Sequence, residues 1–303
     1  MSPEAEDVDA FRAQVARLEA ELHVAKSQLA ASEAKVRQVS SNGTLLGKIP
    51  ISLPLGPSIH NLLLLADSAL PLGSFAYSNG LESFLAHHKP LPAGTTQISL
   101  FHKFLGLSIQ SLASTTVPYV LAAFRDPLDL MDLDNDLDAS TTCTVARRAS
   151  VAQGRALLSV WEKSLAAGAR NSFPESVEAP TVIDTFAKDL HEASHVRGAV
   201  TVNGHLGPLW GVVCLALGLN LEESAYVFLL NHAKAILSAA VRASVMGPYL
   251  AQNILAGKPL QEQVRQSLES VWLTRPEDAG QVVPMLDIWV GRHEMLYSRL
   301  FNS

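Results

Sequence analysis

Residues 62–84 read LLLLADSALPLGSFAYSNGLESF, a stretch in which helix-forming residues give way abruptly to small and turn-forming ones. The four leucines at its start favour a buried helix that ends at Leu65-Ala66. Beyond them, Pro71 fixes its own φ angle and Gly73 can adopt a positive φ. We therefore expect a sharp turn over residues 67–73, between two helices.

The residues after this turn carry an unusual mixture of aromatic and hydroxyl side chains. We expect the next helix to begin near Ser74, which places Phe75 and Tyr77 in its first turn. Residues two apart do not share a helix face, so both rings cannot point into the core. One of the two rings should be exposed, and an exposed aromatic ring is typical of a contact surface.

Outside this stretch, the periodic apolar segments are helical. Residues 145–165 have small and apolar side chains at helical spacing, and Asn220 with Glu223 three positions later resembles a capping box. No segment alternates apolar and polar residues as strands do. We predict an all-α fold, a single multi-helix domain over residues 59–303. Its last helix is expected to carry Met285, Ile288, Trp289, Leu296 and Leu300.

The residues before this domain follow a different pattern. From Val8 to Val39 apolar residues recur with the 3-4 spacing of coiled-coil heptads, which predicts an amphipathic helix over residues 1–40. Such a helix either pairs with a second copy or remains single, and the pattern does not choose between the two. Residues 41–58 are rich in Ser, Gly and Pro and are expected to form a flexible linker.

Composition excludes several classes of protein. The net charge of −6 argues against a nucleic-acid-binding protein, and two cysteines far apart in sequence argue against a disulfide framework or a thiolate zinc site. The acidic N-terminus is unlike a secretory signal. The longest uncharged apolar run, residues 209–219, is shorter than the ~18 residues that a membrane span needs. We expect a cytoplasmic protein without a membrane partner.

One motif suggests metal chemistry. His191-Glu192-Ala193-Ser194-His195 spells H-E-x-x-H, in which two histidines on one helix face bind zinc and the glutamate acts as a base. The alternative function is therefore a zinc metallopeptidase that uses His191, Glu192 and His195. The extended form of this motif places a third ligand at position 201, which is threonine here, so a solvated helix end is the favoured interpretation. No phosphate-binding glycine loop is present in the sequence.

An acidic run at residues 132–138 is also a weak indication of a metal site. Its four aspartates alternate at every second position, which scatters them around a helix instead of focusing them on one cation. We expect a solvated acidic face or a surface for a basic partner. The four are Asp132, Asp134, Asp136 and Asp138.

The stretch at 62–84 resembles the most specific segment of the UreF family of urease accessory proteins. That match is carried by Ala69, Leu70, Pro71, Gly73, Phe75, Tyr77, Ser78, Gly80, Leu81 and Glu82. The segment ARRASVAQGRALL at 146–158 is similar to a family helix through Arg147, Arg148, Ser150, Gln153, Gly154 and Leu157. Residues 204–219, 229–242 and 292–303 are also similar, although Gly207 adds a residue before Pro208. The resemblance covers residues 59–303 and leaves out the first 58, which look like a eukaryotic-type extension.

The resemblance implies an all-α, non-catalytic protein that acts as a dimer. Family members join a UreD/UreH-type protein and the GTPase UreG in a complex that inserts nickel into apo-urease. They activate the GTPase or couple its GTP hydrolysis to metal delivery. Nickel is handled by the complex and is not firmly bound by this subunit, so no cofactor is expected.

The matched segments supply the predicted partner-binding residues. If the protein stimulates a GTPase in trans, an exposed arginine near the partner's phosphates is expected, and Arg147, Arg148 and Arg155 are the candidates. No catalytic or metal-binding residue is expected. The partner-binding set is Pro71, Gly73, Phe75, Tyr77, Ser78, Gly80, Glu82, Arg147, Arg148, Gln153, Gly154, Arg292 and Tyr297.

Overall fold

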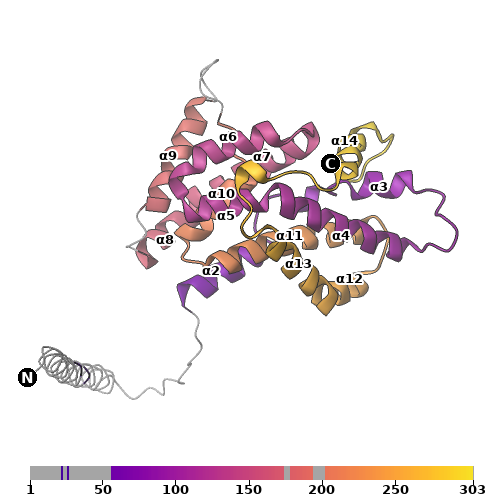
Figure 1. Ribbon diagram of the computed structural model, residues 1–303, viewed down its shortest axis with the longest axis horizontal. Helices are drawn as coiled ribbons and strands as arrows, with labels where there is room; N and C mark the ends of the chain where they lie inside the picture. The colour runs from indigo at the N-terminus through magenta and orange to yellow at the C-terminus, as the bar shows by residue number, and fades with distance from the viewer. Residues whose placement is uncertain (1–21, 23–25, 27–55, 174–177, 194–201, 303) are drawn as a thin grey trace, which may run out of the picture. The chain divides into compact units, whose positions relative to one another are not determined.

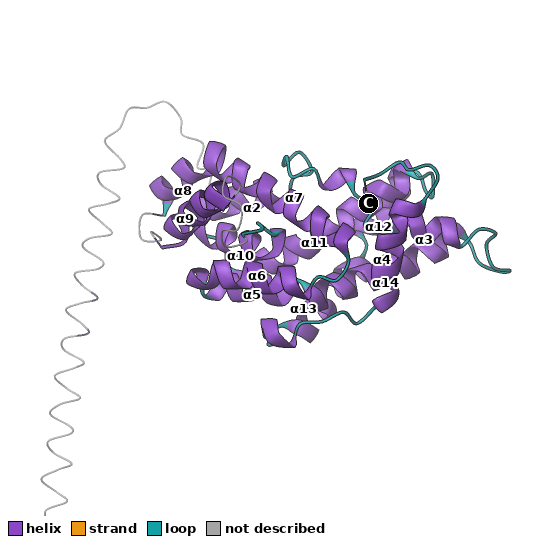
Figure 2. Ribbon diagram, turned by 90° about the horizontal axis from the view of Figure 1, so that it is seen from above, coloured by secondary structure: helices purple, strands orange, loops and turns teal. Residues whose placement is uncertain are grey.

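The structure, a computed structural model, describes residues 56–173, 178–193 and 202–302, together with Leu22 and Lys26. Among these residues every regular element is helical, which confirms the all-α prediction (Figures 1 and 2). The α-helices are α2 (Pro57–Ala66), α3 (Leu81–His87), α4 (Gln97–Thr115), α5 (Val117–Arg125), α6 (Leu130–Ser140), α7 (Thr144–Val160), α8 (Ala166–Ser172), α9 (Glu178–Ala193), α10 (Leu206–Ala216), α11 (Leu221–Arg242), α12 (Pro248–Ala256), α13 (Lys258–Val271) and α14 (Pro284–Arg292).

The chain divides into two compact units, Met1–Pro54 and Leu55–Ser303. The helical body belongs to the second unit and begins with α2 at Pro57, where a proline suits the first turn of a helix. Apart from Leu22 and Lys26, which are helical and exposed, the predicted heptad helix lies outside the described residues, as does the predicted linker up to residue 55, so those two predictions remain predictions. Pro57 and Ser58, expected to end the linker, are the first residues of α2.

Helix α10 is the centre of the body. It packs against α5, α6, α7, α9 and α11. The helix is apolar on all sides, as an element surrounded by others must be. Gly211 permits the closest of these contacts, because a Cβ atom there would lie 2.4 Å from the carbonyl oxygen of Val120 in α5. The apolar run at 209–219 is thus the core of the domain.

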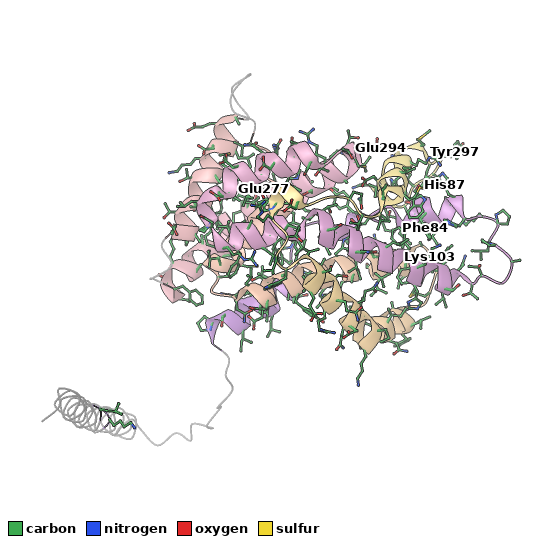
Figure 3. All side chains as sticks on the ribbon, viewed as in Figure 1. Phe84, His87, Lys103, Glu277, Glu294 and Tyr297 are labelled. Atoms are coloured by element: carbon green, nitrogen blue, oxygen red, sulfur yellow. The ribbon has the colours of Figure 1, made fainter. Side chains whose placement is uncertain are left out.

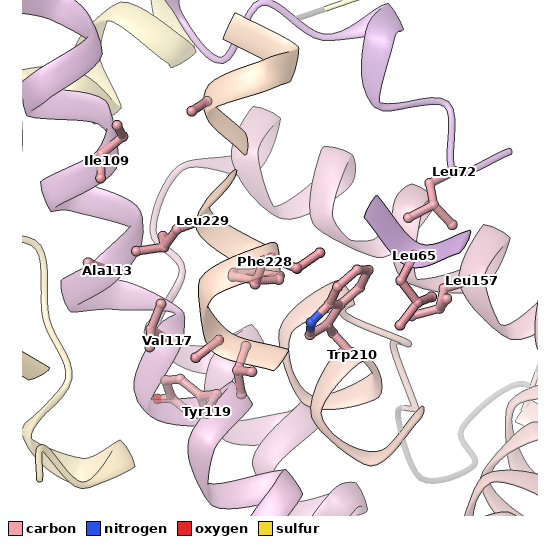
Figure 4. Close-up of a cluster of buried hydrophobic side chains, with 14 of the residues drawn as sticks. Leu65, Leu72, Ile109, Ala113, Val117, Tyr119, Leu157, Trp210, Phe228 and Leu229 are labelled. Carbon is pink, nitrogen blue, oxygen red and sulfur yellow. The ribbon is translucent and has the colours of Figure 1, made fainter. Parts of the chain in front are cut away.

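The core continues from α10 into its neighbours. Figure 4 shows the indole of Trp210 between Phe228 of α11 and Leu65 of α2, with Leu157 of α7 close by. The indole Nε1 donates a hydrogen bond of 3.0 Å to the carbonyl oxygen of Ser224, so its one polar atom is satisfied. Leu65 is fully buried, but Leu63 and Leu64 are exposed, so the four leucines do not make α2 the buried helix that they predicted; only one face of α2 is buried.

Two helical stretches, Gln97–Arg125 and Leu221–Arg242, are long and apolar enough to cross a membrane. In each of them 61% of the apolar window is buried inside the body, as in the core helices of water-soluble proteins. Their apolar character is accounted for by packing within the body.

Helix ends test the local predictions. The Asn220 side chain accepts a 2.7 Å hydrogen bond from the backbone N–H of Glu223, which confirms the predicted cap of α11. The predicted 145–165 helix is α-helical up to Val160 and π-helical over Trp161–Leu165. The last helix was predicted too long, because α14 ends at Arg292.

Candidate functional site

The sharp turn between α2 and α3 forms as predicted. The helix that was expected to begin directly after it, near Ser74, does not form. Gly73 has a φ of 73°, the left-handed conformation that glycine adopts readily. Ser74–Ala76 then make only one 3₁₀ turn, and the next α-helix begins at Leu81. The prediction of a helix from Ser74 was therefore wrong. Asn79 and Gly80 have φ angles of 52° and 86°, which a continuing helix excludes.

Gly80 is required by a neighbour as well as by its φ angle. A Cβ atom at this position would lie 2.9 Å from Cγ2 of Val290 and 3.2 Å from the Val290 backbone nitrogen. The chain between α2 and α3 (residues 67–80, called the turn segment below) therefore packs directly on α14. Only glycine, which has no Cβ atom, allows the chain to approach α14 so closely at position 80.

Side chains of α11 fix the point at which the turn segment leaves α2. Asn231 Nδ2 donates a 2.8 Å hydrogen bond to the carbonyl oxygen of Leu65, and Lys234 Nζ donates to that of Ala66. These carbonyls belong to the last turn of α2, which has no internal partners for them. Burial lowers the pKa of Lys234, and the nearby carboxylate of Asp67 opposes this effect. The ammonium group also interacts favourably with the negative end of the helix dipole.

The middle of the turn segment is joined to α7. Ser74 Oγ donates a 2.7 Å hydrogen bond to Oε1 of Gln153, and Gln153 Nε2 donates to the carbonyl oxygen of Ala149. Leu72 is buried, whereas Phe75 is 66% exposed. The prediction that one of the two aromatic rings is exposed is confirmed, and the exposed ring is Phe75. Tyr77 is half-buried.

The end of the chain covers the turn segment. Residues 296–302 (the tail) follow a single 3₁₀ turn at His293–Met295. The backbone N–H of Asn302 donates a 2.8 Å hydrogen bond to the carbonyl oxygen of Ala76. The backbone N–H of Leu300 donates a 2.8 Å bond to Oε1 of Glu82. Leu296 and Leu300, expected in the last helix, thus belong to a segment held by tertiary contacts.

Two charged side chains connect the tail to the rest of the site. Glu82 accepts through Oε2 from Nε2 of the fully buried His293 at 2.7 Å, in addition to the tail amide. Arg242 of α11 donates to the carbonyl oxygen of Phe75 and lies over the ring of Phe301, with 4.4 Å between Cζ and the ring centroid. Phe301 is only 6% exposed. The guanidinium of Arg242 therefore binds the turn segment through a hydrogen bond and the tail through a cation–π contact.

The predicted site residues separate by burial. Ser78, Gly80 and Gly154 are buried, so they shape the body and offer no surface to another protein. Gly73, Tyr77, Glu82 and Gln153 are half-buried, and Pro71, Phe75, Arg147, Arg148, Arg292 and Tyr297 are exposed. Figure 3 shows Tyr297 and Glu294 at the end of the body where α3 and α14 meet. Contact with partners stays a prediction for the exposed residues.

The candidate arginines of α7 have different surroundings. Arg147 forms an ion pair with Asp138, and Nε of Arg155 donates a 2.9 Å hydrogen bond to the carbonyl oxygen of Asn203. Arg148 pairs at 2.5 Å with Glu294, and both side chains are largely exposed. An exposed pair of this kind stabilises the fold by at most about 1 kcal/mol, so Arg148 can be released at little cost.

The acidic run of α6 is not the solvated face that its spacing predicted. Asp132 and Asp136 are exposed, but Asp134 is fully buried. The carboxylate of Asp134 accepts backbone N–H bonds of 2.6 to 3.1 Å from Asn203, Gly204 and His205. These N–H groups precede α10 and have no partner within that helix, so the carboxylate caps its N-terminus from another element.

Asp138, one turn later, also faces inward. Its Oδ1 lies 3.0 Å from Nε2 of the buried His205, whose Nδ1 lies 3.0 Å from Oγ of Ser150. Burial raises the pKa of Asp138, but hydrogen bonds from His205 and Arg147 outweigh it and the pKa is lowered overall. Asp134 and Asp138 therefore join α6, α7 and α10, which corrects the sequence-based interpretation.

A cavity of about 520 Å³ lies beside the turn segment. Its walls include Ser74 and Phe75 of the turn segment, Ser108 of α4, and His232 of α11. Many of the other lining side chains are also hydroxyls or amides. His232 Nε2 lies 2.9 Å from Oγ of Ser108. Burial of the His232 imidazole lowers its pKa to about 4, and the hydrogen bond with Ser108 opposes this shift.

We expect the free energy of unfolding to fall as the pH is lowered from about 6.5 to about 4. Over this range the unfolded state protonates His232, with a pKa near 6.5, whereas the folded state does not. The expected loss is on the order of 2 kcal/mol. Urea denaturation at pH 7 and pH 5 measures it. His232→Gln should reduce the pH dependence, and His60→Gln, at an exposed position of α2, should leave it unchanged. Equal pH dependence in both variants would contradict the assignment.

The H-E-x-x-H motif lies at the end of α9. His191 and Glu192 are exposed near its last turn, and His195 lies outside the described residues. No group of three or more metal-binding side chains occurs in the part of the chain that the structure describes. The motif is therefore supported by sequence spacing alone.

Sequence reasoning missed the residues that hold the site together. Lys234, Asn231, Arg242, His293 and Asp134 all make contacts across more than 60 positions. The similar segments at 229–242 and 292–303 were the available signal for most of them, but similarity does not reveal contacts. Asp134 gave no such signal.

The chain is similar to known proteins over most of its length. A sequence model described as UreF matches residues 99–257, more than half of the chain. The chain is 38% identical over 244 residues to a "UreF-like" urease accessory protein of Schizosaccharomyces pombe, covering 80% of this chain and 97% of that one. It is 30% identical over 243 residues to urease accessory protein F of Oryza sativa subsp. indica, covering 78% and 82%. It is 28% identical over 242 residues to urease accessory protein UreF of Paenarthrobacter aurescens, covering 79% and 95%.

Proposed function

Because this chain belongs to the UreF family of urease accessory proteins, we propose that it promotes nickel insertion into apo-urease. It acts in the cytoplasm, in a complex with a UreD/UreH-type protein and a UreG-type GTPase, and it modulates GTP hydrolysis by that GTPase. It forms a homodimer within the complex. Nickel is the cargo of the complex and is not firmly bound by this subunit. The UreF family is non-catalytic, which argues against a metallopeptidase that uses His191, Glu192 and His195.

The observation that best supports partner binding is the exposed ring of Phe75. Its side chain is 66% exposed, although the turn segment around it is bonded to α7, to α11 and to the tail. Gln153 holds Ser74, Arg242 holds the carbonyl of Phe75 itself, and Asn302 holds that of Ala76. A large apolar side chain that lies in water on a fixed backbone adds little to the stability of the body. Exposed aromatic rings on a preorganised backbone can carry much of the binding energy at protein interfaces.

Phe75→Ala should reduce assembly with the accessory partners while leaving the body folded. An aromatic side chain that fills a pocket of a partner contributes about 2 kcal/mol or more, which is at least a ~30-fold loss of affinity. Co-purification with the UreD/UreH-type protein and the GTPase, together with urease activity in the same cells, measures the effect.

The matched control for this variant is Tyr249→Ala, which removes another aromatic ring that is 91% exposed, on α12. It should retain assembly and activity, and both variants should melt within about 2 °C of the unaltered protein. Normal assembly of Phe75→Ala with both partners would count against the turn segment as a binding surface. Loss of folding would make the result a stability effect instead.

A further inference from the structure

Residues 8–39 (called the arm below) carry a sequence pattern that the proposed function does not use. Apolar residues recur along the arm with the spacing of coiled-coil heptads, and it contains neither glycine nor proline. The resemblance to the UreF family begins only at residue 59. The alignment with the Schizosaccharomyces pombe relative covers 97% of that protein but 80% of this chain. The arm is therefore an addition to the part that carries the family resemblance.

The apolar residues of the arm follow a single seam. Leu22, at the middle of this seam, is helical and 56% exposed, and Lys26 one turn later is also helical and exposed. On a lone helix such a seam leaves large apolar side chains in water, and a second helix with the same pattern covers them. The seam positions are Val8, Phe11, Val15, Leu18, Leu22, Ala25, Leu29, Ser32, Val36 and Val39.

The charges beside the seam are complementary to themselves. In a parallel pair of arms, Glu21 of one copy faces Lys26 of the other. In a full-length antiparallel pair, Lys26 faces Glu19, and Arg12 faces Glu33. Neither arrangement places like charges opposite each other across the seam. A surface that complements itself in this way fits a second copy of the same segment.

We propose that the arm binds the arm of a second copy of this chain along the seam, as a two-stranded coiled coil. Residues 40–56, which include most of the predicted linker, then connect each arm to α2 with a root-mean-square span of roughly 20–25 Å. A connection of this length keeps two bodies at an effective concentration on the order of millimolar. Two copies therefore stay together at chain concentrations at which their bodies alone separate.

The first experiment measures whether two arms lie against each other in the full chain, without accessory partners. Leu22→Cys places a thiol in the seam, and Ala20→Cys places one on the opposite side of the helix. Both are made in a Cys143→Ser chain, in which the buried Cys214 is the only native thiol left. A short bismaleimide should join two Leu22→Cys chains about tenfold faster, or more, than two Ala20→Cys chains. Equal rates would show that the arms do not pair and that the proposal is wrong.

The second experiment disrupts the seam. Leu29→Asp puts a charge one heptad away from position 22, so it should slow cross-linking of the Leu22→Cys chain about tenfold or more. It should also raise, about tenfold or more, the concentration at which the full chain dissociates in analytical ultracentrifugation. Ala30→Asp adds the same charge at the next residue, outside the seam, and should change neither measurement. Unchanged cross-linking in the Leu29→Asp chain would mean that the seam is not the contact.

The third experiment tests the charges. Lys26→Glu should slow cross-linking of the Leu22→Cys chain about threefold or more, because a glutamate faces position 26 in either orientation. Adding Glu21→Lys should restore the rate if the arms are parallel, and adding Glu19→Lys should restore it if they are antiparallel. Restoration by one of them supports pairing and gives its orientation. Failure of both would contradict pairing of the arms.

Arm pairing is independent of the proposed function, because no residue of the part that resembles the UreF family takes part in it. A Leu29→Asp chain with slow cross-linking should still assemble with the accessory partners at high concentration. If the arms of the unaltered chain cross-link as expected but the chain fails to assemble with those partners, the proposed function is wrong and arm pairing stands.

Discussion

Replacing Asp134 with alanine is expected to lower the free energy of unfolding by about 3–5 kcal/mol. The buried carboxylate is the acceptor for three successive backbone N–H groups, those of Asn203, Gly204 and His205. Alanine leaves these donors without their acceptor, and the N–H groups of Gly204 and His205 belong to buried residues. Each buried donor that loses its acceptor costs about 1–3 kcal/mol. A loss of this size is a large fraction of the ~5–15 kcal/mol that stabilises an ordinary domain.

The same helix supplies the control. Asp136→Ala changes the same residue type on α6 at an exposed position, so it gains the same helix propensity without losing a buried contact. Its effect should stay within about 0.5 kcal/mol. Urea denaturation followed by helical circular dichroism compares the two variants. Similar stabilities for both would mean that the carboxylate of Asp134 is not the acceptor for these N–H groups.

The second large effect is expected for Gly154→Ala. A Cβ atom at Gly154 would lie 2.1 Å from the carbonyl oxygen of Gly204 and 2.7 Å from the backbone nitrogen of Leu206. Both atoms are backbone, so neither can rotate away, and α7 would have to move off the start of α10. We expect a net loss of about 2–4 kcal/mol, after allowing for the ~1 kcal/mol that alanine gains over glycine in a helix.

Gly168→Ala is the control for this substitution. Gly168 lies within α8, and a Cβ atom there meets nothing within 4 Å. The change should therefore raise stability by about 0.5–1 kcal/mol. Melting curves should move in opposite directions for the two glycines. Because Gln153 holds Ser74, the shift of α7 in Gly154→Ala should also disturb the turn segment. A neutral Gly154→Ala variant would show that α7 and α10 do not approach so closely.

The sequence predicted what depends on neighbours along the chain. The cap at Asn220, the positive φ of Gly73 and the exposure of one aromatic ring all follow from short-range geometry, and the structure has each of them. Helical periodicity likewise predicted the all-α fold. These features are set by local propensity and by the spacing of apolar residues.

Predictions failed where distant groups compete with local ones. Leu296 and Leu300 continue a helical spacing, but the amide of Leu300 bonds to Glu82 and not to a carbonyl four residues earlier. The every-second-residue pattern of aspartates indicated solvent, because nothing in it shows that Gly204 brings free backbone N–H groups to Asp134. Contacts of this kind are decided by tertiary structure and leave no periodic pattern.

The contacts of Glu82 with the tail also have a consequence for the order of events during synthesis. Glu82 and Leu300 are separated by 218 positions, so their contact is among the last that a growing chain can make. A ribosome that has already released α10 and α11 for folding still retains the residues that complete the turn segment. The backbone around Phe75 therefore gains its last contacts only after residues 300–302 have left the ribosome, later than the helices that hold it on its other sides.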